Sequence, residues 1–277
     1  NYMDINSHVE YRLCSKKHSP NEIKKRIFEG KVIIFKKSPA ILQIKKIYRH
    51  HFKEFFPEKI SLMSPNINDQ NKKMLSLQKK IKSCNLIKIE FLRFLENLNF
   101  DTSDIYCDKI TLRYSPKKKE LNFGSLRPIG AHRDTWASNI YHQINWWIPL
   151  QHVKEDSSIF IAPAYFKKKI CNNSYFWSYD KFKRRKETSS SPVAKKQIKE
   201  SKKIKFNLNF GEVLCFSGNH LHGSSVGSKS RLNLETRTIS SKDPKNFQIP
   251  ENIDSENTEI KYSWFRSLID GSNYPVE

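Results

Sequence analysis

Residues 130–138 read GAHRDTWAS and place His132 and Asp134 two positions apart. Side chains at positions i and i+2 of an extended chain leave the same face. An imidazole and a carboxylate at this spacing can therefore share a metal ion, or they can form an ion pair at the surface. The triplet by itself favours the surface ion pair, because so short a pattern often arises by chance.

A second segment, GEVLCFSGNHLHGS at 211–224, reads as a turn glycine, a buried strand and a loop that carries His220 and His222. About ten residues later, SRLNLETRT (230–238) predicts a strand with four polar residues on one face: Arg231, Asn233, Glu235 and Arg237. This face either lies on a wet outer surface or lines a polar pocket inside a barrel. A distant histidine would complete a set of two imidazoles and one carboxylate, which is typical of non-haem Fe(II) oxygenases.

The order His-x-Asp, then His-Gly-Ser, then an arginine nine residues on resembles the Fe(II)/2-oxoglutarate-dependent oxygenases. Within them it is most similar to the phytanoyl-CoA dioxygenase-like group, and the resemblance covers roughly residues 105–240. It implies that His132, Asp134 and His222 are the catalytic metal ligands. His220 is the less favoured choice for the third ligand.

The same resemblance implies that Arg231 binds the distal carboxylate of 2-oxoglutarate, with Arg237 as an alternative or as a second anion contact. A guanidinium suits this role because its fork binds a carboxylate through two hydrogen bonds. The implied cofactors are Fe(II), 2-oxoglutarate as cosubstrate and O2. The implied reaction is hydroxylation or desaturation of a small, anionic molecule, with release of succinate and CO2, and a carboxylate at position 134 disfavours halogenation.

Alternation along residues 139–150 places Gln143, Asn145 and Trp147 on one face of a predicted strand. We expect this face to look into the barrel, where Gln143 or Asn145 can bind 2-oxoglutarate or substrate. Weaker candidates for substrate contact, for which ordinary packing is an equal alternative, are Arg113, Thr135, Trp136 and Trp147.

The elements that must position these residues divide the chain in two. Residues 1–100 predict three helices, at about 20–29, 38–51 and 70–97, with a short strand at 31–35. Residues 105–240 predict strands at 108–114, 139–150, 158–163, 212–218 and 231–240. The fold class is therefore mainly β with flanking helices, and the resemblance implies a double-stranded β-helix core of the jelly-roll or cupin-like kind.

A chain of 277 residues is near the upper size of a single-cored domain, so we expect one domain over 1–277. The barrel carries an insert at 165–205, aromatic at first and then rich in lysine. It is either a solvated, partly disordered loop or a lid over the barrel mouth. The tail at 241–277 is expected to be irregular.

The net charge of +22 is compatible with a nucleic-acid partner, but 38 lysines against 12 arginines are also typical of A/T-rich codon usage. Five widely spaced cysteines predict reduced thiols, and no apolar run is long enough for a membrane span. We therefore expect a cytoplasmic enzyme that acts on a small molecule. The two alternatives are a cupin-like metal-binding isomerase or binding protein, and a basic nucleic-acid-binding protein with structural histidines.

Overall fold

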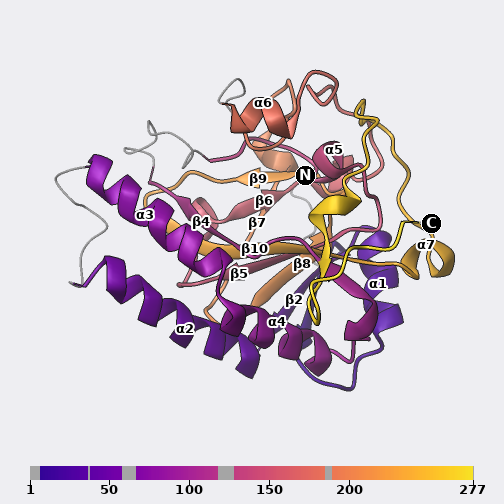
Figure 1. Ribbon diagram of the computed structural model, residues 1–277. Coiled ribbons are helices and arrows are strands. Elements are labelled where there is room, and N and C mark those ends of the chain that lie inside the picture. Colours follow the sequence, from indigo (N-terminus) through magenta and orange to yellow (C-terminus); the bar gives the residue numbers. More distant parts are fainter. Residues whose placement is uncertain (1–6, 37, 58–66, 118–127, 185–188, 277) are drawn as a thin grey trace.

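The computed structural model describes residues 7–36, 38–57, 67–117, 128–184 and 189–276 (Figure 1). The first two predicted helices are confirmed. Helix α1 (Pro20–Phe28) has Ser19 as its N-cap, and the chain leaves it through Gly30 at a φ of 99°. Helix α2 (Pro39–Phe55) has Ser38 as its N-cap and runs one turn past the predicted end.

The prediction of one long helix at 70–97 is wrong, because the structure has α3 (Ile67–Lys82) and α4 (Asn85–Asn97). The buried residues explain the break: Met74, Leu77 and Ile81 form the inner stripe of α3, and the stripe of α4 begins six residues later at Ile87. In a straight helix, six residues at about 100° each would rotate the second stripe by about 120° from the first. The extended residue Cys84 lets both stripes face the core.

The strands form two sheets. The larger one has the order β1–β2–β8–β5–β10–β3–β11, with β4 also paired to β10. Its strands are β1 (Val9–Leu13), β2 (Val32–Lys36), β3 (Ile105–Cys107), β4 (Thr111–Ser115), β5 (Ile144–Pro149), β8 (Val213–Ser217), β10 (Arg231–Ser240) and β11 (Arg266–Ser267). The smaller sheet is β7 (Ile204–Lys205), β6 (Ile159–Ile161) and β9 (His222–Ser224). The remaining elements are short: α5 (Thr135–Ser138), α6 (Tyr179–Lys183), α7 (Asp243–Asn246) and the 3-10 turns at Thr102–Asp104, Glu155–Ser157, Pro163–Tyr165, Glu200–Lys202 and Tyr262–Trp264.

Strand β5 lies in the middle of the large sheet and separates two cores, as its alternation predicts. Ile144, Trp146 and Ile148 pack with the apolar faces of the helices, and α2, α3 and α4 cover this side of the sheet (Figure 1). Trp147 points to the other side, where a second core fills the space between the two sheets. The chain is thus sheet-rich with flanking helices, and the polar residues of β5 and β10 face the space between the sheets.

Several boundaries differ from the prediction. The strand expected at 139–150 begins only at Ile144, because Asn139 takes a left-handed conformation (φ 55°) and starts a turn. Strands β1 and β3 were not predicted, since they are short and carry charged or polar residues. The tail at 241–277 is mostly irregular, but its strand β11 pairs with β3.

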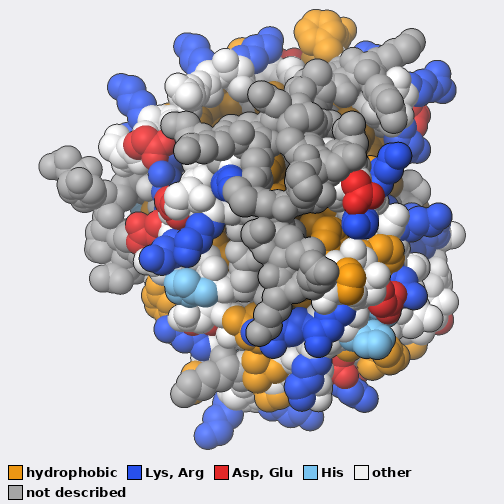
Figure 2. All heavy atoms as spheres, turned by 90° about the vertical axis from the view of Figure 1, so that its left-hand side faces the viewer, with side chains coloured by type: hydrophobic (Ala, Val, Ile, Leu, Met, Phe, Trp, Pro, Cys, Tyr) orange, Lys and Arg blue, Asp and Glu red, His pale blue; other side chains and the backbone are white. Residues whose placement is uncertain are grey.

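Lysine and arginine side chains are scattered over the face drawn in Figure 2, and acidic side chains lie between them. They do not form one continuous basic stripe on the described part of this face. All five cysteines are free thiols. No described helix combines the length and apolarity that crossing a membrane requires.

Candidate metal centre

The three predicted metal ligands meet between the two sheets. His132 and His222 are locked together by reciprocal backbone hydrogen bonds, from His132 N to His222 O (2.8 Å) and from His222 N to His132 O (2.9 Å). Asp134 N donates to Gly218 O (3.0 Å), just before the loop that carries His222. Backbone pairing across the site therefore sets the spacing of the two imidazoles and the carboxylate.

The side chains converge on one point. His132 Nε2 lies 3.7 Å from Asp134 Oδ1, and His222 Nε2 lies 3.8 Å from Asp134 Oδ2. One ligand atom from each residue falls within 4.8 Å of the others, and all three residues are buried. One ion can therefore contact all three side chains, and its remaining coordination positions stay open on one side.

The second nitrogen of each imidazole is held by a carbonyl. His132 Nδ1 bonds to Gly130 O (2.8 Å) and His222 Nδ1 to His220 O (2.9 Å). These bonds place the proton on Nδ1 and leave both Nε2 lone pairs free toward the ion. Burial lowers the pKa of His132 to about 3, and the nearby His222 adds to the effect. The ring of His132 is therefore neutral at pH 7, as a metal ligand requires.

His220, the alternative third ligand, turns away from this point. It is buried, its Nε2 lies 3.0 Å from Gly30 O, and its ring packs on Phe166. The structure thus brings His222, and not His220, to His132 and Asp134.

Both oxygens of Asp134 accept a hydrogen bond. Arg237 Nη2 donates to Oδ1 (3.0 Å), and Asn145 Nδ2 donates to Oδ2 (2.5 Å). Burial would raise the pKa of Asp134, but the positive charge and the hydrogen bond of Arg237, together with the adjacent imidazoles, outweigh burial and lower the pKa. The group is therefore a carboxylate at neutral pH. Gln143, which donates to Asn145 Oδ1 (3.1 Å), in turn orients the asparagine.

Arg237 lies between two carboxylates. Its Nη1 donates to Asp108 Oδ2 (2.6 Å), while its Nη2 donates to Asp134 Oδ1. Burial alone would lower the pKa of Arg237, but the two carboxylates outweigh it and raise the pKa. The charge of this arginine is thus already compensated within the protein.

Arg231 has a different environment. It is buried and donates only to uncharged groups among the described residues: Asn233 Oδ1 (3.1 Å), Ser157 O (2.9 Å) and Ser224 Oγ (3.3 Å). Its guanidinium lies 5.4 Å from the ring centre of Trp147. Burial lowers the pKa of Arg231 to about 10, so it stays a cation at pH 7. A buried cation without a carboxylate partner costs free energy unless an anion reaches it.

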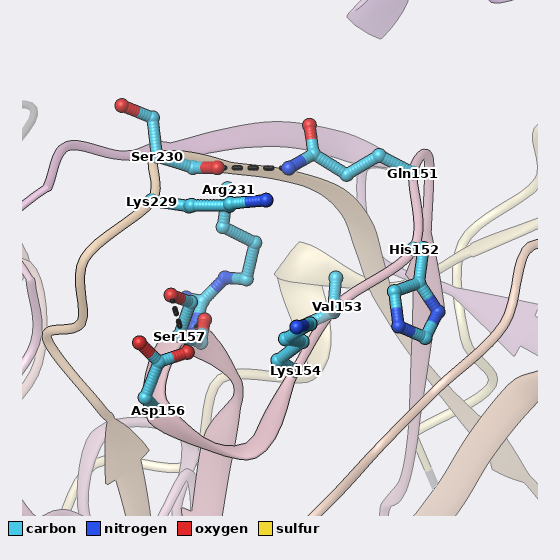
Figure 3. Close-up of a pocket in the computed structure, with 9 residues that line it drawn as sticks. All are labelled: Gln151, His152, Val153, Lys154, Asp156, Ser157, Lys229, Ser230 and Arg231. Atoms are coloured by element: carbon cyan, nitrogen blue, oxygen red, sulfur yellow. Dashed lines mark hydrogen bonds between the residues drawn. The ribbon is translucent and has the colours of Figure 1, made fainter.

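A small cavity of about 30 Å³ adjoins this arginine at the outer end of β10 (Figure 3). Gln151, Ser157, Lys229 and Ser230 lie around it, and Gln151 donates to Ser230 O (2.8 Å). This space holds only one or two water molecules. A five-carbon diacid does not fit there, so this cavity is not the binding site of such an anion.

The weaker candidates lie at various distances from this arrangement. Arg113 on β4 pairs with Glu235 (2.6 Å), and both side chains are partly exposed at the edge of the polar face of β10. Thr135 is buried in α5 beside Asp134. Trp136 is buried in a separate core cluster and donates to Asp254 Oδ1 (2.8 Å). A substrate contact for Arg113, Thr135, Trp136 or Trp147 remains a prediction.

Sequence reasoning missed a clamp behind the metal ligands. Arg133, between the two ligands of the His-x-Asp motif, is fully buried and donates to Asp254 (3.1 Å) and to the carbonyls of Tyr165 (2.7 Å) and Lys168 (2.9 Å). Ile170 N donates to the same carboxylate (3.1 Å). The clamp joins the insert and the tail to the metal motif. A charged residue inside the motif was the available signal, but nothing in the sequence pointed to Asp254.

The sequence matches no protein-family model and no curated protein sequence. Among solved structures it is similar to EvdO2 from Micromonospora carbonacea var. aurantiaca complexed with 2-oxoglutarate (9% identity, 81% of this chain and 92% of that one, TM-score 0.49). It is also similar to the epimerase SnoN in complex with Fe3+, alpha ketoglutarate and nogalamycin RO (11% identity, 93% and 96%, TM-score 0.45). A third is the non-heme monooxygenase ThoJ (11% identity, 74% and 71%, TM-score 0.45). Because all three scores are below 0.5, the function proposed next rests on the geometry of the site.

Proposed function

We propose that this chain is an Fe(II)- and 2-oxoglutarate-dependent oxygenase that hydroxylates or desaturates a small molecule. The observation that carries the proposal is the combination of two buried groups that strand β9 connects. One is the cluster of His132, Asp134 and His222. The other is the guanidinium of Arg231, to which no carboxylate of the described residues is hydrogen-bonded and which a metal-binding protein without an anionic cosubstrate does not need.

The donor set fits Fe(II). Two neutral imidazoles and one carboxylate on one side of an ion are the ligands of non-haem Fe(II) oxygenases, and they leave adjacent positions for other ligands. Hydrogen bonds to Asp134 from Arg237 and Asn145 fix the orientation of the carboxylate and occupy both of its oxygens. Such outer contacts support metal affinity.

The surroundings of Arg231 fit 2-oxoglutarate. Ser224, which accepts from Arg231, follows His222 by two residues on β9, so the backbone positions of these two residues lie roughly 7 Å apart along the strand. Asn233 Nδ2 beside Arg231 is buried and has no hydrogen-bond partner among the described residues. A carboxylate at Arg231 would satisfy this donor and compensate the buried charge.

These environments also distinguish the two arginines. Arg237 already forms ion pairs with Asp108 and Asp134, whereas the hydrogen-bond partners of Arg231 among the described residues are all uncharged. We therefore assign the anchoring of the distal carboxylate to Arg231. Arg237 holds Asp134 in place.

When bound, Fe(II) with 2-oxoglutarate and O2 supplies oxidation of an unactivated C–H bond, with release of succinate and CO2. The chain's residues hold and enclose the reactants. His132, Asp134 and His222 fix the ion, and Arg231 orients the diacid. Trp147 and the core between the sheets keep water from that side of the pocket. The finer fold that this function implies is a double-stranded β-helix formed by the two sheets.

The substrate would reach the ion beside the partly exposed residues Arg113, Glu235 and Arg237. Their mixed charge suits a small molecule with an anionic group. The described part of the insert borders the same region, because Ala194 N donates to Ala131 O (2.7 Å) next to His132. We therefore propose that the described part of the insert at 165–205 covers the bound substrate.

An anaerobic titration of the apo-protein with Fe(II) and 2-oxoglutarate tests the proposal. We expect a visible metal-to-ligand charge-transfer band in the wild type and its loss or displacement in Asp134→Ala. Iron binding without a band would favour a cupin-like metalloprotein. No iron binding at all would leave the two histidines and Asp134 as structural residues.

A further inference from the structure

We propose that α2 carries a second metal site, which binds Zn2+ or a similar divalent transition metal through His50, His51 and Glu54. This site lies on the outer surface of the helical layer, apart from His132, Asp134 and His222. It rests on the geometry of α2 alone and does not depend on the proposed oxygenase function.

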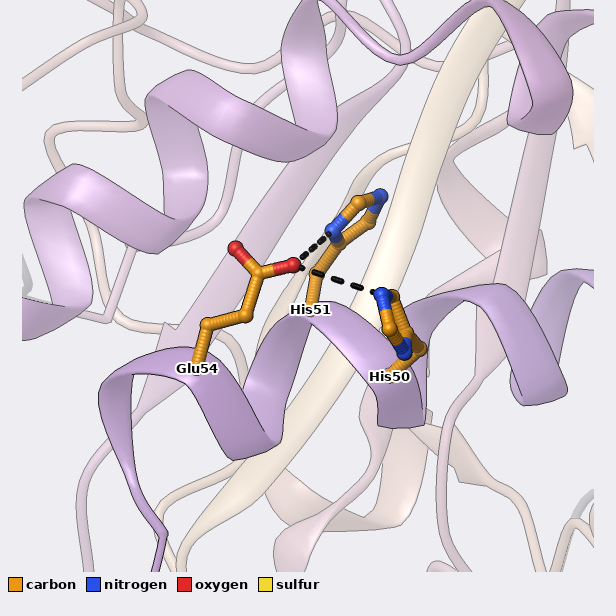
Figure 4. A group of neighbouring side chains, drawn as sticks. All are labelled: His50, His51 and Glu54. Atoms are coloured by element: carbon orange, nitrogen blue, oxygen red, sulfur yellow. Dashed lines mark hydrogen bonds and ion pairs between the residues drawn. The ribbon is translucent and has the colours of Figure 1, made fainter.

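The three side chains meet because of helical geometry. Residues three and four apart are neighbours on a helix, so Glu54 lies one turn above both His50 (i+4) and His51 (i+3). Figure 4 shows one oxygen of its carboxylate facing both imidazoles. Glu54 Oε1 is 2.9 Å from His51 Nδ1 and 3.6 Å from His50 Nε2. One donor atom from each residue lies within 4.8 Å of the others.

These separations suit a metal ion. Ligands at about 2.0–2.1 Å from a tetrahedral zinc ion lie about 3.3 Å from one another, and the two observed distances bracket this value. Two imidazole nitrogens and a carboxylate oxygen are ordinary zinc donors. His50 has 78% of its side chain exposed, so an ion can enter and water can complete the coordination.

The inner histidine is already oriented. His51 has 13% of its side chain exposed, and its Nε2 lies 3.6 Å from the sulfur of Cys84, the N-cap residue of α4. Without metal, Nδ1–H donates to Glu54 Oε1 and Nε2 can accept from the thiol. A bound ion would replace the proton on Nδ1, and Nε2–H would then donate to the sulfur. The bound ion would therefore connect the last turns of α2 to the start of α4.

One nearby group opposes the ion. Lys80 Nζ lies 3.8 Å from Glu54 Oε2, the oxygen that points away from the histidines. The pair is exposed and weak, and it leaves Oε1 for the metal. Removing the charge of Lys80 should therefore tighten metal binding, whereas a purely structural ion pair predicts no such gain.

The test is equilibrium dialysis of the folded protein against Zn2+, with the bound metal counted by atomic absorption. The Asp134→Ala background weakens the buried site by removing one ligand. The difference in bound Zn2+ between this background with and without His50→Ala or Glu54→Gln then reports the surface site. We expect His50→Ala and Glu54→Gln each to weaken this binding at least about tenfold, since loss of an outer contact alone costs that much. Lys80→Gln should tighten it roughly two- to fivefold.

His152→Ala, which removes an exposed histidine on another part of the chain, is the matched control and should leave Zn2+ binding unchanged. His50 and Glu54 are on the surface, so unchanged circular dichroism melting should show that their variants fold. Equal binding in Asp134→Ala with and without Glu54→Gln would overturn the proposal. So would binding that appears only at millimolar Zn2+.

Discussion

The contrast between Arg231 and Arg237 gives the sharpest prediction. Replacing Arg231 by alanine removes the proposed partner of a buried carboxylate, which typically costs about 2–5 kcal/mol of binding free energy. At 1.4 kcal/mol per tenfold, the affinity for 2-oxoglutarate should fall roughly 30- to 4000-fold. The apo-protein loses no ion pair in this variant, because the partners of Arg231 are uncharged among the described residues. Its stability should change less than that of Arg237→Ala, because the variant loses three hydrogen bonds and the packing on Trp147 but also removes a buried charge.

Arg237→Ala should behave in the opposite way. It leaves the carboxylates of Asp108 and Asp134 buried without their shared cation. Breaking a buried pair from one side typically costs about 3–5 kcal/mol. We expect the lower end of this range, because 27% of the side chain of Arg237 is exposed. The variant should melt at a lower temperature and bind iron more weakly.

Two measurements separate these effects: the midpoint of the charge-transfer band in an anaerobic 2-oxoglutarate titration, and the melting temperature of the apo-protein. Arg93→Ala, at an exposed arginine of α4, is the control for both. A midpoint in Arg231→Ala within about threefold of the wild type would refute the assignment of the anchor. If Arg237→Ala instead lost 2-oxoglutarate binding while keeping its iron affinity, the anchoring role would pass to Arg237.

Three further predictions concern the ligands, a strand contact and pH. Asp134→Ala should bind Fe(II) at least about tenfold more weakly, measured by iron titration, since it loses a ligand; unchanged affinity would contradict the site. Gly223→Ala should also lower iron affinity, because its Cβ would lie 2.9 Å from Gly130 O and push β9, with His222, out of place; the same titration checks this. Burial, with a smaller contribution from Lys24, lowers the pKa of His142 to about 4. The unfolded chain, with an ordinary value near 6.5, therefore takes up a proton first as pH falls. The contribution of His142 to the free energy of unfolding should drop by up to about 3 kcal/mol between pH 6.5 and 4. Urea titrations should therefore show a smaller pH dependence for His142→Phe.

Local patterns were sufficient to predict much of the fold. Ser-Pro pairs marked the starts of α1 and α2, and alternation in residues 144–148 assigned the two faces of β5. The prediction of one long helix at 70–97 is wrong because it follows from the apolar content of the segment alone. The angular positions of the apolar residues around the helix axis indicate two helices. Strand β1 escaped notice because its residues VEYRL are stabilised by pairing with β2, a tertiary contact that local sequence does not report.

In the candidate site too, local sequence predicts some features, whereas others depend on tertiary contacts. Residue type and spacing identified His132, Asp134 and His222 as a group that the structure brings together. The contacts of Asp134 with Arg237 and of Arg133 with Asp254 depend on segments that meet only in the folded chain. Neither Asp108 nor Asp254 has a motif around it. The environment that distinguishes Arg231 from Arg237 is likewise visible only in three dimensions.

The reciprocal bonds between His132 and His222 have a consequence for the folding pathway. The metal ligands come from segments far apart in the sequence, and strands β5, β8 and β10 lie between and beside them. Contacts between distant segments form late, because closing long loops costs entropy before the contact repays it. The ion can therefore be captured only after the sheets have closed. Iron should therefore slow the unfolding of the folded protein. Iron present during refolding should leave the folding rate nearly unchanged.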